Sequence, residues 1–177
     1  MNPNLITTLR LLLLIVVIIV DSFGFYYFAL VIIFLSFFSD MLDGYVSRKF
    51  NKVSEIGIYY DHFADKIFVH LLLIYYLSFD LIPFTIVGLI VFRDYLALGL
   101  RQYAVTKNVT IASVLSGKIK LWLQAWYIIL IAVGRIYTVP KVLMLGFGIF
   151  VVVWTYFSLF DMFVKNKKIL KKIKKEF

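Results

Sequence analysis

The sequence contains no cysteine, which excludes disulfide bonds, thiolate nucleophiles and zinc sites with cysteine ligands. Any metal ion must therefore bind oxygen or histidine ligands. Charged residues are also scarce: they make up 16% of the 177 residues, whereas 63% are hydrophobic and 19% are aromatic. Because this composition lies far outside that of ordinary soluble domains, the sequence predicts an integral membrane protein.

No stretch rich in glycine, serine or proline separates the apolar segments, so a flexible linker between domains is absent. These residues show no internal repeat, and we expect no soluble appendage. We therefore expect one compact membrane domain over residues 1–177. Its basic tail, residues 164–177, suits either an anionic membrane surface or simple solvation.

Long apolar segments indicate how often the chain crosses the membrane, because a spanning helix needs roughly 20 apolar residues. Six segments meet this requirement: 4–21, 25–46, 56–77, 83–105, 115–137 and 140–163. Short stretches with helix-breaking residues supply the tight turns at 21–24, 78–83 and 138–140. The predicted fold class is all-α, a polytopic membrane protein with six transmembrane helices and both termini on the same side.

Lysine and arginine are distributed unequally between the two sides of this predicted bundle. One side carries three in the loop after the second span, four between Arg101 and Lys120, and seven in the tail. The other side carries only Arg135 and Lys141. The positive-inside rule therefore makes both termini cytoplasmic. This asymmetry also accounts for the net charge of +9 without a nucleic-acid partner.

Carboxylates and small residues share helical faces in the second and third spans. One face carries Asp40, Asp43, Gly44 and Ser47, and the other carries Gly57, Asp61 and Asp65. A single aspartate of this kind would simply mark a helix end at the membrane interface. Four in register require compensation, since each intramembrane aspartate costs about 2.5–3.5 kcal/mol.

Divalent cations are the best source of the missing positive charge, because Arg48 and Lys66, the basic residues that directly adjoin the motif's small residues and aspartates, are too few to pair all four aspartates. Mg²⁺ and Mn²⁺ prefer carboxylate oxygens, and a pair of such ions is a common arrangement for displacement at phosphorus. Glycines beside the site would let a nucleotide or diphosphate approach the backbone, and Arg48 is placed to bind phosphate oxygens. The pattern indicates a reaction site for phosphate chemistry.

The pattern Asp40-x-x-Asp43-Gly44-x-x-Ser47-Arg48, followed after eight residues by Gly57-x-x-x-Asp61-x-x-x-Asp65, resembles the signature of the CDP-alcohol phosphotransferase family. Ser47 is the one departure, since the family usually has alanine there. The resemblance implies a six-helix membrane enzyme, usually a homodimer. Such an enzyme transfers a phosphoalcohol group from a CDP-linked donor to an acceptor hydroxyl and releases CMP.

The resemblance also implies a role for each motif residue. Asp40, Asp43 and Asp61 would be metal ligands, while Asp65 would be a ligand in some members and the proposed general base. Gly44, Ser47 and Gly57 would line the cytidine pocket, and Arg48 would contact the donor's phosphates. The chemistry agrees, because a carboxylate kept ionised by adjacent cations can accept the proton of the attacking hydroxyl.

Other parts of the chain are similar to the phosphatidylglycerophosphate synthases of this family. The similar segments are Pro3-Asn4-x-Ile6-Thr7-x-x-Arg10, Arg93-Asp94, Gly99-Leu100-Arg101 and Gly117-Lys118-Ile119-Lys120. Two residues depart from them: Asp94 stands where glutamate is usual, and Leu121 stands where threonine is common. Both departures lie near the expected acceptor region, so these segments do not identify the acceptor alcohol.

Basic residues near the cytoplasmic ends of the spans are candidates for binding an anionic acceptor such as glycerol 3-phosphate. The candidates are Arg93, Arg101, Lys118 and Lys120. The alternative is anchoring by side chains that snorkel to the interface. Anchoring is favoured for Lys120, and less so for Arg93 and Arg101, which lie deeper in the fourth span.

Together these features predict a phospholipid-synthesising enzyme of the cell membrane whose active site faces the cytoplasm. Its donor would be CDP-diacylglycerol or CDP-archaeol, its acceptor glycerol 3-phosphate, and its cofactors two Mg²⁺ or Mn²⁺ ions. Inositol phosphate as acceptor and cardiolipin synthesis are the alternatives within the family. A small cation channel or transporter would also bury aspartates, but it would not require the Gly-Ser-Arg spacing. A structural membrane subunit is a more distant alternative.

Overall fold

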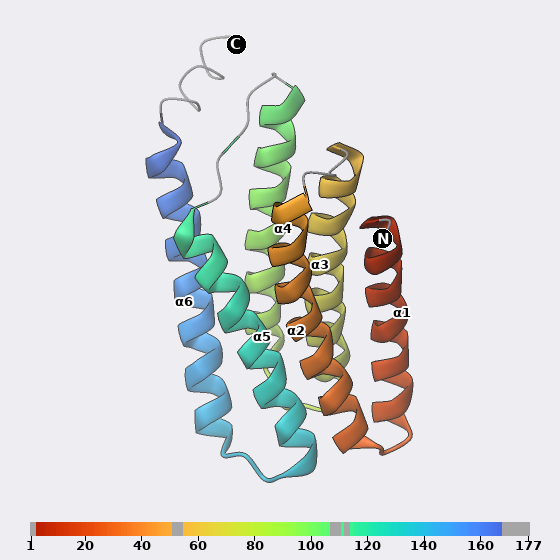
Figure 1. Cartoon of the computed structure of the whole chain (residues 1–177). Helices are drawn as coiled ribbons and strands as arrows, with labels where there is room; N and C mark the ends of the chain where they lie inside the picture. Colours follow the sequence, from red (N-terminus) through yellow and green to blue (C-terminus); the bar gives the residue numbers. More distant parts are fainter. Residues whose placement is uncertain (1–2, 51–54, 107–110, 112–113, 168–177) are drawn as a thin grey trace. The chain divides into compact units, whose positions relative to one another are not determined.

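The computed structural model describes residues 3–50, 55–106, 111 and 114–167, with the side chains of 3–9, 40–50 and 55–65 outside the description. Six helices run through this part of the chain: α1 (Pro3–Ser22), α2 (Tyr26–Phe50), α3 (Glu55–Leu77), α4 (Phe84–Thr106), α5 (Leu115–Ile136) and α6 (Lys141–Lys165) (Figure 1). The described residues form no strand. The predicted all-α fold and its six helices are confirmed, with boundaries within four residues. Residues 168–177 of the predicted tail lie outside the described part.

The turns follow from local backbone chemistry. Gly24 adopts a φ of 85°, a left-handed conformation that glycine accepts without a steric penalty. A Cβ at Gly24 would meet no atom within 4 Å, so its backbone conformation rather than crowding favours glycine. The Gly24 N–H donates to the Asp21 carbonyl at 3.0 Å, and the Phe25 N–H donates to the Val20 carbonyl at 3.1 Å. These bonds satisfy carbonyls at the end of α1.

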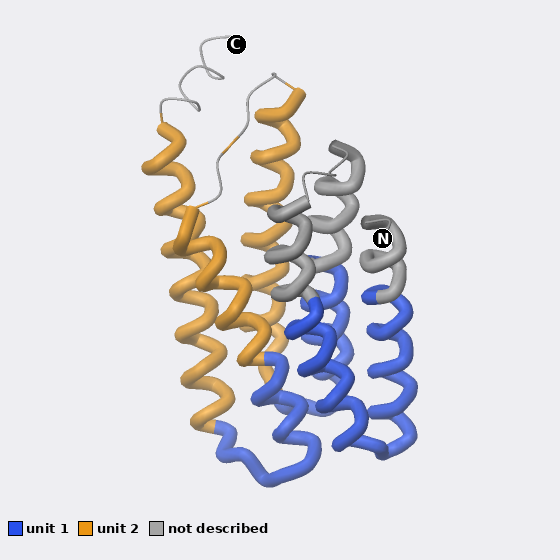
Figure 2. Tube along the Cα trace, viewed as in Figure 1, with its two compact units in different colours: residues 1–81, 128–141 blue, residues 82–127, 142–177 orange. Residues whose placement is uncertain are grey.

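The chain divides into two compact units (Figure 2). Unit 1 comprises residues 1–81 and 128–141, and unit 2 comprises residues 82–127 and 142–177. In unit 1, α1 packs against both α2 and α3. Its interior contains side chains that are completely buried: Val17, Ile33, Leu72, Leu73 and Tyr76.

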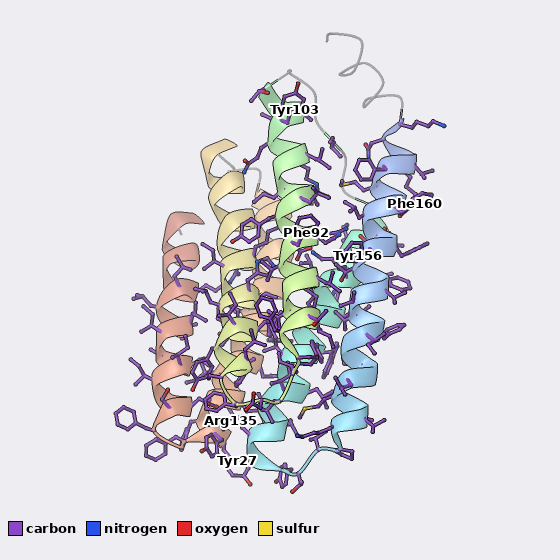
Figure 3. The ribbon with its side chains drawn as sticks, turned by 180° about the vertical axis from the view of Figure 1, so that it is seen from behind. Tyr27, Phe92, Tyr103, Arg135, Tyr156 and Phe160 are labelled. Carbon is purple, nitrogen blue, oxygen red and sulfur yellow. The ribbon has the colours of Figure 1, made fainter. Side chains whose placement is uncertain are left out.

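In unit 2, α4 and α6 are joined by the Tyr156 hydroxyl, which donates to the Leu89 carbonyl at 3.4 Å (Figure 3). Gly148 of α6 allows close packing against α5, because a Cβ there would collide with the ring and hydroxyl of Tyr127 and with Ile86. Small residues at such contacts let helix backbones approach closely in membrane proteins. The requirement at Gly148 is therefore steric rather than conformational.

Several features of the described residues fit a membrane protein. By length and composition, α5 and α6 could each cross a membrane, and Tyr26–Ser39 and Lys66–Leu77 are shorter apolar helical segments. Large apolar side chains are exposed on the helix surfaces, including Phe92 of α4 and Phe160 of α6 (Figure 3). Such extensive apolar exposure is unusual for a soluble monomer and suits contact with lipid.

Candidate functional site

The aspartate motif lies in two helices of unit 1. Asp40, Asp43, Gly44, Ser47 and Arg48 lie in the C-terminal part of α2, and Gly57, Asp61 and Asp65 lie in the N-terminal part of α3. The backbone is helical at all of these positions, so α2 continues through Arg48, which the charge count placed in the loop after the second span. Their side chains lie outside the described part of the structure, so the predicted convergence of the carboxylates stays a prediction.

The two motif-bearing helices are in contact close to the motif. The rings of Phe37 in α2 and Phe68 in α3 pack edge to face, with centroids 5.5 Å apart and an interplanar angle of 88°. Phe37 precedes Asp40 by three residues and Phe68 follows Asp65 by three, which is about one helical turn in each case. Asp40 and Asp65 therefore each lie about one helical turn from a direct contact between α2 and α3.

The carboxylates of this motif form a donor set that suits hard divalent cations, which prefer several carboxylate oxygens. Among the residues that the structure describes, no group of three or more histidine, aspartate or glutamate side chains could hold a metal ion.

Unit 2 contains a buried ionic cluster around Asp94 of α4. The Asp94 Oδ1 atom accepts hydrogen bonds from Arg93 Nη1 at 3.0 Å and from Lys120 Nζ at 2.7 Å. Its Oδ2 atom accepts one from Gln124 Nε2 at 3.1 Å. The residues are almost fully enclosed, with exposed fractions of 1% for Asp94, 5% for Arg93 and 4% for Lys120. One carboxylate thus holds two cations and joins α4 to α5.

The cluster extends to α6 through Ser158. Arg93 Nη2 donates to Ser158 Oγ at 3.1 Å, and Ser158 is only 1% exposed. Gly117, in the first turn of α5, lies beside this hydroxyl, since a Cβ there would be 3.7 Å from Ser158 Oγ. Arg93 is consequently oriented by two partners, a carboxylate on its own helix and a hydroxyl on α6.

The remaining predicted acceptor residues divide between the cluster and the surface. Arg101 is partly buried two turns after Arg93, within electrostatic range of both Arg93 and Asp94. The side chain of Lys118 is exposed. On a helix, residues two apart point in different directions, so Lys118 cannot share the buried face of Lys120. The structure groups three of the four predicted residues and leaves Lys118 on the surface.

Anchoring by snorkelling was the favoured interpretation for Lys120, and the structure corrects it. A snorkelling side chain keeps its ammonium group in water. The Lys120 ammonium is instead enclosed and paired with Asp94. The sequence could not separate the two arrangements, because Asp94 and Lys120 are 26 residues apart.

The cluster has more positive than negative charge. Among the residues that the structure describes, Arg93, Arg101 and Lys120 contribute three positive charges and Asp94 contributes one negative charge, a surplus of two. In addition, the buried Nε atoms of Arg93 and Arg101 have no hydrogen-bond partner among the described residues. Because uncompensated buried charge is costly, this arrangement is suited to binding an anion.

Sequence reasoning missed two of the neutral residues of this cluster, Gln124 and Ser158. Gln124 lies four residues after Lys120, so the two form one polar stripe on an otherwise apolar helix. That spacing could have indicated from the sequence that Gln124 shares a helix face with Lys120. For Ser158 the sequence offered none, because isolated serines are common in membrane helices and usually bond to their own helix.

A second network ties the start of α5 to the end of α6. Ser116 Oγ donates to Asp161 Oδ2 at 2.5 Å, and Lys165 Nζ donates to the same oxygen at 3.1 Å. The Trp154 indole N–H donates to the Ser116 carbonyl at 3.3 Å. Lys165 neutralises the charge of Asp161, so this network carries no net charge. It connects the start of α5 to the end of α6.

Unit 1 contains its own partly buried ion pair, at the helix ends opposite the motif. Asp21 Oδ2 accepts hydrogen bonds from Arg135 Nε at 3.3 Å and from the Tyr75 hydroxyl at 2.8 Å. The Arg135 guanidinium carbon also lies 3.6 Å from the ring centroid of Phe79 and 4.6 Å from that of Tyr26 (Figure 3). Arg135, which the charge count assigned to the non-cytoplasmic side, is therefore partly buried against aromatic side chains of this unit.

Comparison with known proteins places the sequence pattern in context. A CDP-diacylglycerol–glycerol-3-phosphate 3-phosphatidyltransferase from Bacillus subtilis is 35% identical over 94 residues, which cover 53% of this chain and 49% of that protein. The protein of the same name from Mycoplasma pneumoniae is 36% identical over 101 residues, 57% of this chain and 43% of that one. A probable CMP-forming cardiolipin synthase from Drosophila melanogaster is 31% identical over 98 residues, 55% of this chain and 30% of that protein. The chain thus spans half or less of the length of these relatives.

The family comparison covers far more of the chain. The model of the CDP-alcohol phosphatidyltransferase family matches residues 1–157. This range includes the complete aspartate motif of α2 and α3 as well as the Asp94 cluster residues of α4 and α5. The resemblance seen in the motif is confirmed, and the chain belongs to the CDP-alcohol phosphatidyltransferase family.

Proposed function

We propose that the protein synthesises phospholipid by moving a phosphatidyl or archaetidyl group from a CDP-linked lipid to glycerol 3-phosphate, with release of CMP. The observation that carries this proposal is the surplus of two positive charges that the described residues place around Asp94. A phosphomonoester carries about 1.5 to 2 negative charges at neutral pH. The phosphate of glycerol 3-phosphate would therefore balance the cluster.

The proposed setting is the cell membrane, with six spans, cytoplasmic termini and an active site facing the cytoplasm. The helices have 20 to 25 residues, which at 1.5 Å per residue matches a hydrocarbon core of about 30 Å. The distribution of lysine and arginine supports the orientation. We also propose a single membrane domain that forms a homodimer, as is usual in the family.

The donor would bind at the aspartate motif. Asp40, Asp43 and Asp61 would hold two Mg²⁺ or Mn²⁺ ions, with Asp65 as a further ligand. These cations would supply the positive charge that balances the donor's diphosphate. Small side chains at Gly44, Ser47 and Gly57 would leave space for the cytidine, and Arg48 would bind phosphate oxygens.

The proposed reaction is a displacement at the lipid-bearing phosphorus of the donor. The acceptor's hydroxyl oxygen forms the new bond to that phosphorus, and the bond from phosphorus to the oxygen of CMP breaks. The hydroxyl proton passes to Asp65, which acts as general base. Arg93, Arg101 and Lys120 would bind the phosphate of the acceptor.

Phosphatidylglycerol and inositol phosphate are the alternative acceptors, and they are compared with glycerol 3-phosphate by their charge and by the names of the relatives. Phosphatidylglycerol, the acceptor in cardiolipin synthesis, has one phosphodiester charge and would leave one positive charge of the cluster unbalanced. Inositol phosphate is a phosphomonoester and would match the cluster equally well. Two of the relatives described above are named for glycerol 3-phosphate, which favours that acceptor, whereas the Drosophila relative keeps cardiolipin synthesis as the second candidate.

The deciding experiment is CMP release by the purified protein from CDP-diacylglycerol. Glycerol 3-phosphate, inositol phosphate and phosphatidylglycerol are supplied separately, each with and without EDTA. We expect EDTA-sensitive CMP release that depends on glycerol 3-phosphate. Release with phosphatidylglycerol alone would replace the proposal with cardiolipin synthesis, and metal-dependent ion flux without CMP release would indicate a channel.

A further inference from the structure

Ser158 differs from Ser22 and Ser36, two other serines of the apolar helices. Ser22 donates to the Ile18 carbonyl and Ser36 donates to the Ile32 carbonyl, both at 2.7 Å and both four residues back along the same helix. This bond is the usual way for a serine in an apolar helix to satisfy its hydrogen. Ser158 makes no such bond in the described part of the chain and is instead directed to Arg93.

The Ser158 oxygen acts as an acceptor, which leaves its hydrogen available. A hydroxyl group has one hydrogen to donate and lone pairs to accept. Arg93 Nη2 uses a lone pair at 3.1 Å, and the described residues provide no acceptor for the hydrogen. An unused donor at 1% exposure carries a desolvation cost unless a partner arrives. A ligand with acceptor oxygens would satisfy it.

The neighbouring cations indicate the kind of ligand. Arg93 uses Nη1 for Asp94 and Nη2 for Ser158, while its buried Nε has no hydrogen-bond partner among the described residues. Lys120 has three hydrogens on its ammonium group, and one is directed to Asp94. An occupant bearing several acceptor oxygens and negative charge fits these donors, and a phosphomonoester has both properties.

We propose that Ser158 of α6 is a ligand of the acceptor's phosphate, donating its hydroxyl hydrogen to a phosphate oxygen while it orients Arg93. This inference rests on the proposed function and extends it, because it adds a neutral, specificity-determining residue to the three cations.

The test compares three variants of the full-length protein in detergent. Ser158→Ala removes the hydroxyl, Ser158→Thr retains it, and Thr155→Val is the control. Thr155 lies one turn earlier on α6, is completely buried, and its hydroxyl has no hydrogen-bond partner among the described residues. Replacing that hydroxyl by a methyl group of similar size should leave acceptor binding unchanged.

We expect Ser158→Ala to raise the KM for glycerol 3-phosphate about tenfold or more, since hydrogen bonds to charged groups are among the stronger ones. The KM for CDP-diacylglycerol should change less than twofold. Ser158→Thr should recover most of the acceptor affinity. Equal increases for Ser158→Ala and Thr155→Val would show a general effect of α6 packing and would overturn the inference.

A binding measurement separates this inference from the proposed function. Glycerol 3-phosphate should raise the Tm of the wild-type protein in EDTA without donor, and the increase should be smaller for Ser158→Ala. If the wild-type protein neither releases CMP nor shows a Tm shift, the proposed function fails. If the wild-type protein shows both and Ser158→Ala matches it, only the role of Ser158 is overturned.

Discussion

The ammonium group of Lys120 lies 2.7 Å from a carboxylate oxygen of Asp94, and both side chains are buried. The same oxygen accepts a hydrogen bond from Arg93, so two cations share one anion. Burial strengthens electrostatic interactions and raises the cost of any missing partner. The acceptor proposal depends on this imbalance, and it can be tested one charge at a time.

Replacing Asp94 by asparagine should strongly destabilise the protein. Asp94→Asn keeps the size of the side chain but leaves Arg93 and Lys120 without their counter-charge, which should cost about 3–5 kcal/mol. The measurement is Tm in detergent together with denaturant unfolding. Lys165→Ala is the control, because Lys165 is 57% exposed in its ion pair with Asp161 and should contribute under about 1 kcal/mol. Equal losses for both variants would contradict the role of burial.

Removing the charge of Lys120 should weaken acceptor binding. Lys120→Met lowers the surplus from two positive charges to one, so the KM for glycerol 3-phosphate should rise tenfold or more while the KM for CDP-diacylglycerol stays similar. The matched variant is Lys118→Met on the same helix, whose exposed position predicts a much smaller increase. A larger effect at Lys118 than at Lys120 would place the acceptor phosphate outside the cluster.

Changing a motif aspartate should abolish metal-dependent chemistry. Asp43→Asn and Asp61→Asn each remove one charged oxygen donor, so CMP release should fall to background and added Mg²⁺ or Mn²⁺ should not restore it. In the wild-type protein, EDTA should remove activity and either cation should return it. Retained CMP release in either variant would refute the ligand assignment of that aspartate.

Disrupting the Asp21–Arg135 pair should affect stability without affecting substrate affinity. Arg135→Met leaves the buried Asp21 carboxylate with the Tyr75 hydroxyl as its remaining described partner, and the expected loss is about 3–5 kcal/mol. The double variant Asp21→Asn/Arg135→Met should lose less than the sum of the single losses. Lys141→Ala, an exposed change near the start of α6, is the control. Additive losses would show that the two residues do not interact.

Two glycines of α6 provide a steric test of helix packing. Gly148→Ala places a methyl group against Tyr127 and Ile86, which should cost about 1–3 kcal/mol. Gly146→Ala, half a turn away, meets no atom within 4 Å and should be neutral or slightly stabilising. Unfolding measurements on both variants would decide, and equal effects would rule out the close contact at Gly148.

The fold could be predicted in detail where the signal is local. The six helices were found because long apolar runs and the breaks at Gly24, Pro83 and Pro140 are properties of neighbouring residues. The length of α2 was underestimated by four residues, because the residues that follow Val46 are mostly polar yet helical. Composition alone does not distinguish a polar helix end from a loop.

The pairing of charged groups could not be predicted from the sequence. Arg93 and Ser158 are 65 residues apart, and Asp21 and Arg135 are 114 apart. A lysine or arginine near the end of a span is compatible with both anchoring at the interface and pairing in the interior. Only the packing of the helices shows that Arg135 lies between aromatic rings and that Lys120 is enclosed.

By itself, the sequence determined the helical class, the family and the chemistry expected of the aspartate motif, because apolar length and helical spacing are encoded in short stretches. The tertiary structure decided which basic residues act together. It placed Arg93 and Lys120 on one carboxylate, added Ser158 from α6, and left Lys118 on the surface. The physical reason is that burial and charge pairing depend on which helix faces meet, and those meetings involve residues far apart in the chain.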